Sequence, residues 1–415
     1  MSDNIVDTAV PFIRKEINQL SAEELQNLRT AYALLQEEVE EGGYEQIAGL
    51  HGFPDWECPH GGLKFLPWHR AYLLRFEQAL QRYVPDVTLP YWDWISQESQ
   101  RNGLPNAVAE STYFDAEGVE VLNPLYSAQI PIGGETIRRP GQISRLSELE
   151  NPVAIAMQEN NFVDFSGRIE NPHNFIHVWV GGNGGSMSNV TFAAFDPIFW
   201  MHHSYVDRQW YIWQQNNPDA VVPDDIAEEI YEELDMSAND ILDINNLPYQ
   251  YDEFPEPAVG SRRVITPFGL AKFRAVESMQ PRVELIIHNL PMTSDSFELR
   301  IFLNEPNADH TSPIDGNPHF AGSVFLFGMG EGMHSMSMHD HGHHGHHGHH
   351  GHHGHHGHHG QKVTFDGAVD ITKALNLSVS QGENFDIKML ILGTDGQTVE
   401  NPPFAMPSVS LKRHP

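Results

Sequence analysis

Histidines are the residues of this sequence whose number and spacing could support chemistry. There are 26 of them, more than the 24 lysines and arginines together. Histidine is the most common neutral nitrogen ligand for transition metals in proteins. His51, His60 and His69 follow one another at intervals of nine residues. This spacing predicts a first group of three nitrogen ligands in the N-terminal half of the chain.

A second group lies further along the chain. His173 and His177 are four residues apart, so on a helix they share one face and can reach a single metal ion. Such a pair alone fits two buried, hydrogen-bonded histidines equally well. His202 and His203 lie in an apolar segment, 196–208, where an imidazole costs free energy unless it is paired or ligated. Two sets of three nitrogen ligands suit copper, and by ligand type alone zinc.

Helices must position most of these side chains. Ser21 followed by Glu24 forms a capping box, which predicts a helix start there. Further helices are predicted by apolar periodicity, the last two with a proline near the start, where no hydrogen bond is lost: 70–83, 172–180 and 197–213. We therefore predict a mainly helical domain over residues 1–252, in which a four-helix core holds the metals.

The second half of the chain has strand character. Short apolar runs separated by turn residues predict an antiparallel β-sandwich over residues 282–415, with strands at 283–287, 297–302, 323–327, 363–365 and 385–392. Residues 253–281 are predicted to be a linker, and its acidic, proline-rich start is expected to be a proteolysis-prone hinge. A Gly-His-His repeat at 339–360 is predicted to be an insertion outside the core.

The composition excludes several classes of partner. The formal net charge of −32 argues against nucleic acid, which needs a basic face. No stretch approaches the roughly 20 apolar residues of a membrane helix. The first residues lack the pattern of a signal peptide, so we expect a cytoplasmic protein, with export by another route left open. Cys58 is the one cysteine, so an internal disulfide is impossible. The oligomeric state is not encoded legibly.

Several motifs, in the correct order, resemble the family of tyrosinases, catechol oxidases and mollusc hemocyanins. The resemblance spans most of the chain. It extends to a C-terminal block that resembles the β-sandwich covering the copper site in mollusc hemocyanin and latent fungal tyrosinases. The motifs that carry it are His51-Gly52, Cys58-Pro59-His60, Pro67-Trp68-His69-Arg70, Pro90-Tyr91-Trp92-Asp93-Trp94, His173-Asn174-Phe175-Ile176-His177, the 196–208 block, Tyr249-Gln250-Tyr251, Phe302-Leu303-Asn304 and Asn317-Pro318-His319-Phe320-Ala321-Gly322.

The resemblance implies a binuclear copper site that uses O2. Carried over by position, His51, His60 and His69 would hold one copper ion. The other ion would be held by His173, His177 and His203, with His202 beside the ligands. The resemblance also implies a covalent thioether between Cys58 and His60, which would lock the imidazole ring and remove a reactive thiol.

The same resemblance favours a phenol oxidase that hydroxylates monophenols and oxidises the resulting catechols. Glu170 and Asn174 match family positions that hold a water acting as general base, although a helix-start carboxylate and a solvated amide would look the same. Val190 matches the family's gate position, where a small residue leaves room for small phenolic substrates. The alternatives are a catechol oxidase without monophenol activity, a hemocyanin-like O2 carrier and a copper store.

The C-terminal domain is expected to act as a lid that keeps the enzyme latent. The loop after Phe327 would place Met329, Met333 or Met336 over the copper ions, since methionine is long and adaptable. Because thioethers suit Cu(I) and imidazoles Cu(II), this region is also predicted to bind additional copper, through Met329, Met333, His334, Met336, Met338 and His339.

Overall fold

The structure is a computed structural model that describes residues 11–39, 42–252, 281–330, 364–379 and 384–414. The predicted linker, apart from residue 281, and the Gly-His-His repeat lie outside these residues. So do several members of the predicted lid and accessory copper segment, for which the sequence predictions stand untested: Met333, His334, Met336, Met338 and His339.

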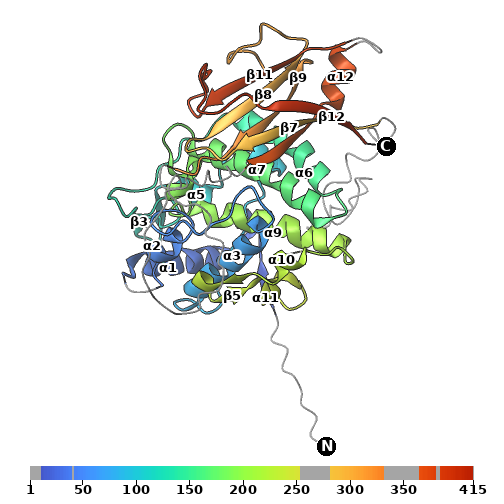
Figure 1. The fold of residues 1–415 in the computed structure, drawn as a ribbon. Coiled ribbons are helices and arrows are strands. Elements are labelled where there is room, and N and C mark those ends of the chain that lie inside the picture. The colour runs from blue at the N-terminus through green and yellow to red at the C-terminus, as the bar shows by residue number, and fades with distance from the viewer. Residues whose placement is uncertain (1–10, 40–41, 253–280, 331–363, 380–383, 415) are drawn as a thin grey trace, which may run out of the picture.

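The N-terminal half is built from helices around a large aromatic core (Figure 1). We call residues 11–252 the helical region. Its helices are α1 Ala22–Glu37, α2 Tyr44–Gly49, α3 Phe65–Gln81, α4 Gln97–Asn102, α5 Asn106–Ala109, α6 Glu150–Ala156, α7 Phe162–Gly181, α8 Val190–Ala193, α9 Ile198–Asn216, α10 Asp224–Ala227 and α11 Ala238–Leu242. Single turns of 3₁₀ helix are η1 Ile17–Gln19, η3 Ser186–Ser188 and η4 Glu232–Leu234, and a longer one is η2 Ile143–Leu149. Short strands are β1 Phe12–Arg14, β2 Thr112–Phe114, β3 Glu120–Leu122, β4 Ile230–Tyr231, β5 Met236–Ser237 and β6 Tyr249–Tyr251.

The helix starts show where local sequence signals decide the structure. The capping box between Ser21 and Glu24 is present, and α9 begins directly after Pro197, as predicted. The predicted start at Pro172 is wrong, because α7 begins ten residues earlier, where the Asn161 side chain accepts a hydrogen bond from Asp164 N. Burial of most of this helix outweighs the hydrogen bond that an internal proline removes.

A buried ion-pair cluster sets the register between α3 and α9. Asp207 on α9 accepts from Arg70 on α3 at 2.5 Å and lies 3.4 Å from Arg14 on β1. The hydroxyls of Tyr249 and Tyr251 on β6 donate to the same carboxylate at 2.6 and 2.7 Å. Burial by itself would raise the pKa of Asp207, but the two arginines outweigh it and hold the pKa below its usual value. Since Arg70 follows His69, this cluster also fixes the position of a predicted ligand.

The C-terminal half forms two antiparallel sheets of three strands each, in the orders β10-β7-β12 and β11-β8-β9. Residues 281–330, 364–379 and 384–414 are called the β region. The two sheets share one apolar core, as a sandwich requires. The predicted strands are all present with shifted bounds, whereas β12 and α12 were not predicted. The elements are β7 Val283–Pro291, β8 Phe297–Leu303, β9 Phe320–Leu326, β10 Thr364–Asp370, α12 Thr372–Ser378, β11 Ile387–Gly393 and β12 Ser408–Arg413.

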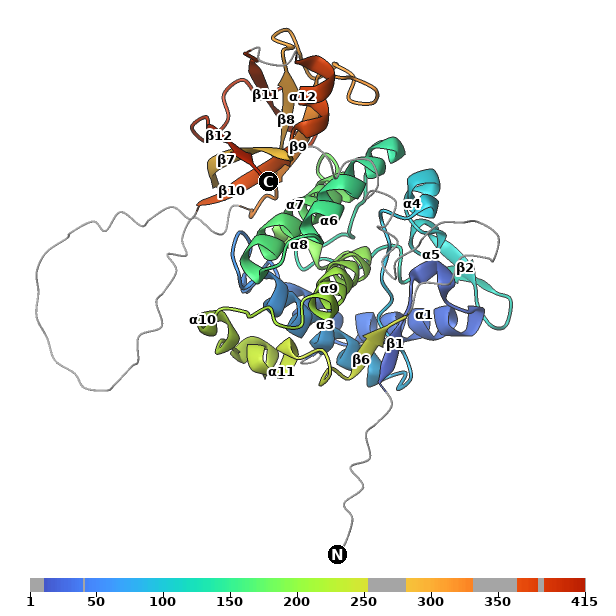
Figure 2. The same cartoon turned by 90° about the vertical axis from the view of Figure 1, so that its right-hand side faces the viewer.

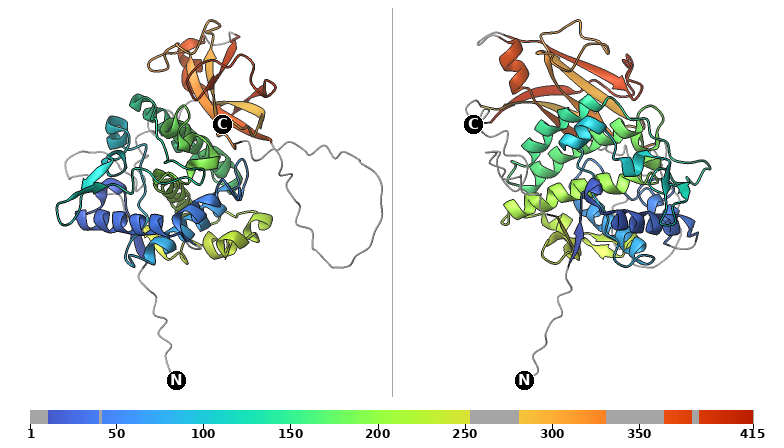
Figure 3. Two further views of the ribbon diagram at one scale, coloured as in Figure 1. Left: turned by 90° about the vertical axis from the view of Figure 1, so that its left-hand side faces the viewer. Right: turned by 180° about the vertical axis from the view of Figure 1, so that it is seen from behind.

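The β region stands on one side of the helical region, with α6 and α7 directly beneath it (Figures 1 and 2). Helix α7 contacts both β9 and β10, and the views from the opposite sides agree with this arrangement (Figure 3). On the other side of α7 lies α9, which also packs against α3. A single helix therefore contacts the β region on one side and the core on the other. None of the described helices is long and apolar enough to cross a membrane.

Candidate metal centre

The structure brings the six predicted histidines together between α3, α7 and α9. His69 lies on α3, His173 and His177 on α7, and His203 on α9. The remaining two, His51 and His60, lie in the loop between α2 and α3 rather than on a helix, which differs from the expectation that helices supply every ligand. Two overlapping groups of donor atoms lie within 4.8 Å of one another: His173, His177, His202 and His203, and His51, His69 and His203.

The second trio, which we define as His173, His177 and His203, converges through one atom of each ring. The Nε2 atoms of His173 and His177 are 3.0 Å apart, and each lies 3.2 Å from the Nε2 of His203. Three imidazole nitrogens can approach in this way only if some are unprotonated, and a metal ion between them would satisfy all three lone pairs. The geometry is that of a three-nitrogen metal site contracted around its centre.

The first trio, His51, His60 and His69, is more open. Its ring centroids are 5.3 to 5.5 Å apart. The His69 ring stacks on His203 of the second trio, with centroids 4.3 Å apart and planes inclined by 9°. The two trios are therefore adjacent, as a site for two neighbouring ions requires.

Hydrogen bonds fix which ring nitrogen faces the centre. Nδ1 of His69 lies 2.8 Å from the Phe65 carbonyl, and Nδ1 of His177 lies 3.0 Å from the Met187 carbonyl. Because a carbonyl oxygen can only accept, each Nδ1 carries the proton and each Nε2 keeps its lone pair for a metal. The Nε2 atoms of the first trio are buried and without a hydrogen-bond partner: His51, His60 and His69.

Burial keeps these imidazoles neutral. Desolvation lowers the pKa of His69 to about 3. In the second trio, burial first and the neighbouring imidazoles second lower the pKa of His173 and His203 well below the usual value. Neutral imidazole is the form that binds copper. Buried, unpaired and unprotonated nitrogens in two sets of three thus fit a pair of copper ions, the donor set the sequence predicts.

His202 and Cys58 lie beside the trios. His202 falls in the same donor group as the second trio, but it is the Nε2 of His203 that converges with those of His173 and His177. Sγ of Cys58 is 3.3 Å from Nδ1 of His60, and burial raises the pKa of the thiol well above its usual value. The thiol is therefore next to the ring to which the sequence prediction links it, in its unreacted form.

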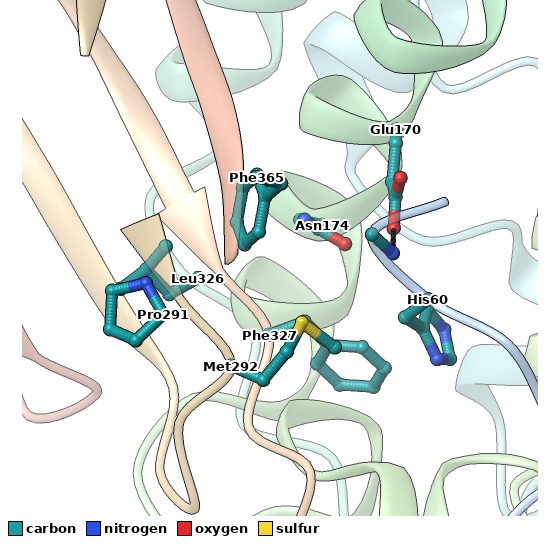
Figure 4. A pocket seen from close by; sticks show the side chains of 9 residues that line it. His60, Glu170, Asn174, Pro291, Met292, Leu326, Phe327 and Phe365 are labelled. Atoms are coloured by element: carbon teal, nitrogen blue, oxygen red, sulfur yellow. Dashed lines mark hydrogen bonds between the residues drawn. The ribbon is translucent and has the colours of Figure 1, made fainter. Parts of the chain in front are cut away.

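A small cavity adjoins His60 on the side facing the β region (Figure 4). Glu170 and Asn174 on α7 line one wall, and Met292 and Phe327 from the β region line the other. The cavity volume is about 10 Å³, which is room for about one water molecule. Both residues predicted to hold a water therefore face a space of that size.

The two polar residues of this wall are held firmly. Glu170 accepts a hydrogen bond from the Gly61 amide at 2.6 Å, and Asn174 Oδ1 lies 2.9 Å from Nδ1 of His173. Glu170 is half-buried, and the surrounding protein desolvates it enough to raise its pKa to about 7, against the opposite effect of the Gly61 amide. A carboxyl group of this pKa can exchange a proton near neutral pH.

Phe327 is the side chain of the β region that covers the histidines. Its ring stacks on His177, with centroids 4.1 Å apart, and meets the edge of His60 at 5.4 Å. Sequence reasoning proposed a methionine of the following loop and missed Phe327. Of those methionines the structure describes only Met329, which is buried in the core shared with the helical region. Val190, the predicted gate, is buried, and its amide donates to the Gly328 carbonyl at 2.9 Å.

Comparison with known proteins identifies the arrangement. The sequence model of the tyrosinase family, described as the common central domain of tyrosinase, matches residues 41–216, the segment that holds all six histidines. Hemocyanin 1 of Megathura crenulata is 38% identical over 224 residues, which cover 49% of this chain and 6% of that protein. Unit G of the beta-C chain of Helix pomatia hemocyanin is 30% identical over 277 residues, 58% of this chain and 66% of that protein. The chain belongs to the family of tyrosinases and hemocyanins.

Solved structures of this family share the whole fold. An octopus hemocyanin functional unit superposes with a TM-score of 0.71 at 24% identity, covering 96% of this chain and 99% of that one. A tyrosinase from Burkholderia thailandensis gives 0.68 at 18% identity, covering 97% and 100%. The family fold thus includes the β region. By sequence, however, the chain matches only a small part of the long hemocyanins, 6% of Megathura crenulata hemocyanin 1.

The residues that connect the β region to the family's copper site carry no motif of their own. Asn171 binds the edge of β9, donating to the Ser323 carbonyl at 3.2 Å and accepting from Phe325 N at 2.9 Å. Ser296 donates to the Ser188 carbonyl at 2.7 Å. The one available signal was position, since Asn171 lies within the histidine motif of α7, two residues before His173.

Proposed function

We propose that this protein is a copper-dependent phenol oxidase that hydroxylates monophenols, oxidises catechols and is held latent by its β region. The observation that carries the proposal is the cavity beside His60, where Glu170 and Asn174 face the place that a phenol hydroxyl would occupy and Phe327 fills the rest. The family relationship supports a binuclear copper site, and the activity is our inference from this geometry.

The two trios would each hold one copper ion, through the Nε2 atoms that lack other partners. Bound copper would supply the capacity to bind O2 and accept electrons from a phenol. The protein supplies the rest. It fixes the imidazoles in one tautomer, excludes bulk water from the histidines and presents hydrogen-bonding groups at the cavity.

Glu170 would take the proton of a monophenol through the single water that the cavity can hold. A phenol has a pKa near 10, so a base close to its hydroxyl favours the more reactive phenolate. The raised pKa of Glu170, about 7, makes it a stronger base than an ordinary glutamate while leaving it ionised above neutral pH. Asn174 keeps His173 and the cavity wall in register. Catechols need this assistance less, because their oxidation inserts no oxygen.

Latency follows from how tightly the β region is attached. Glu298 on β8 is nearly buried and pairs with Arg145 at 2.8 Å, while Glu284 on β7 is fully buried and pairs with Arg168 at 2.6 Å. Burial opposes ionisation of Glu298, but Arg145 and then other arginine contacts outweigh it and lower its pKa to about 2. The pair therefore stays charged at physiological pH. With the β region in place, the remaining cavity is too small for a phenol ring.

Oxygen carriage without phenol oxidation is the second candidate. It is favoured by the curated relatives, which are hemocyanins at 30 to 38% identity, and by the closed cavity. A catechol oxidase that lacks monophenol activity is the third, and it differs from the proposal only in the role of Glu170.

The deciding experiment measures O2 consumption by the copper-loaded chain with tyrosine and with a small catechol. It is done before and after cutting at a protease site engineered into residues 253–281. We expect low rates in the intact chain and turnover of both substrates after cutting, with a His177→Ala variant inactive and short of copper. Reversible O2 binding without consumption of either substrate, before and after cutting, would refute the oxidase and favour the carrier.

A further inference from the structure

We propose that the β region also retains copper, and that it does so selectively at the second trio. This inference rests on the two-copper site of the proposed function but not on phenol oxidation. It comes from following each ligand's hydrogen bonds outward. The hydrogen-bond partners of His173 and His177 are themselves bound by backbone or side-chain groups of the β region, whereas the first trio is oriented from within the helical region.

The His173 ring is held by a relay of two hydrogen bonds. Its Nδ1 donates to Asn174 Oδ1 at 2.9 Å, and Asn174 Nδ2 donates to the Phe325 carbonyl on β9 at 3.1 Å. The Phe325 amide in turn donates to Asn171 Oδ1 at 2.9 Å. Asn171 and Asn174 thus bind both sides of one residue of an edge strand. The β9 carbonyl fixes which way the Asn174 amide points, and so which nitrogen of His173 faces the metal.

The His177 ring is held through a second segment of the helical region. Its Nδ1 donates to the Met187 carbonyl at 3.0 Å, and the adjoining Ser188 carbonyl accepts from Ser296 Oγ at 2.7 Å. The segment is clamped again three residues after Met187, where Val190 N donates to the Gly328 carbonyl. Ser296 Oγ also accepts from Gly328 N at 2.8 Å, so one serine joins both clamps. The carbonyl that orients His177 is therefore positioned by the β region.

The first trio shows the contrast. His69 is oriented by the Phe65 carbonyl of its own helix, and His60 has the Cys58 sulfur as its neighbour. Among the described residues, the one ring contact from the β region to this trio is the edge of Phe327 on His60. Displacing β9 would leave these arrangements in place while removing the outer support of the second trio.

The expected size of the effect comes from metal sites in general. Loss of a group that orients a ligating histidine typically weakens metal affinity 10- to 100-fold. Asn171 and Ser296 contact no copper-binding histidine, so replacing either acts only through the β region. They are positioning residues, and their effect should appear at one copper ion of the two.

The test measures copper release from the full-length, copper-loaded chain into excess bicinchoninate under reducing conditions. Asn171→Ala and Ser296→Ala are compared with the wild type and with Ser410→Ala, a matched change at an exposed serine whose hydroxyl contacts His288 on the surface. Each is repeated in a His69→Ala background, where only the second trio is complete, and in a His177→Ala background, where only the first is. Thermal unfolding of each variant checks that the fold persists.

We expect Asn171→Ala and Ser296→Ala to speed copper release about 10-fold where the second trio is complete. Release in the His177→Ala background and in Ser410→Ala should not change. Equal acceleration in both backgrounds would indicate general loosening and overturn the inference, as would unchanged release in both. Selective release from a chain that never oxidises phenols would uphold this inference and refute the proposed activity. Turnover by a chain with unselective release would do the reverse.

Discussion

Replacing Phe327 with alanine should relieve latency without cutting the chain. The Phe327 side chain is 5% exposed and stacks on His177 at 4.1 Å. Burying a phenylalanine contributes about 1.5–3 kcal/mol, and this contribution is lost when the β region lifts away from the histidines. At 1.4 kcal/mol per factor of ten, its absence shifts the balance between closed and open forms by about 10- to 100-fold. It also leaves a space of roughly one aromatic ring beside the histidines.

The assay is catechol oxidation by the intact, copper-loaded variant, compared with the wild type before and after cutting within 253–281. We expect the intact Phe327→Ala chain to turn over a small catechol at least about 10-fold faster than the intact wild type. Once both chains are cut, the difference should vanish. Phe404→Ala, at a half-buried ring that packs on Phe297 within the β region, is the matched control and should remain latent. An intact Phe327→Ala chain as slow as the wild type, when the cut wild type is active, would show that another group blocks the site.

Three further predictions concern the site and its maturation. Glu170→Gln should lower monophenol turnover of the opened protein about 100-fold while changing catechol turnover little, and equal losses would make Glu170 structural. Because the carboxylate is the basic form and its pKa is raised to about 7, monophenol kcat/KM should fall as pH drops below about 7, and Glu170→Gln should abolish that limb of the pH profile. If Cys58 joins His60, 3.3 Å away, mass spectrometry of the copper-matured segment 55–63 should show a loss of two hydrogens, whereas a fully alkylatable thiol would exclude the link. Deleting 339–360 should slow copper loading at limiting metal or reduce copper bound beyond two ions, and unchanged loading and content would make the repeat a spacer.

Much of the site could be predicted from the sequence because its signals are local. The spacing of His173 and His177 places both on one face of a helix whatever surrounds it. The capping box at Ser21 and the proline before α9 also act over one helical turn, and both predicted starts are confirmed. Alternating apolar residues defined the strands of the β region to within a few residues. The family motifs added the order in which separate segments contribute ligands.

Tertiary structure decided whatever depends on segments far apart in the chain. Pro172 reads as a helix start locally, yet burial of α7 carries the helix through it. Phe327 reads as the end of a strand, and only the packing of β9 on α7 places it over His177, which lies 150 residues away. The relay from Phe325 through Asn174 likewise requires two domains to meet in one register. Spacing within a motif fixes which atoms can bind a metal, whereas closure of the site and support of the ligands arise from contacts that the sequence specifies only through the whole fold.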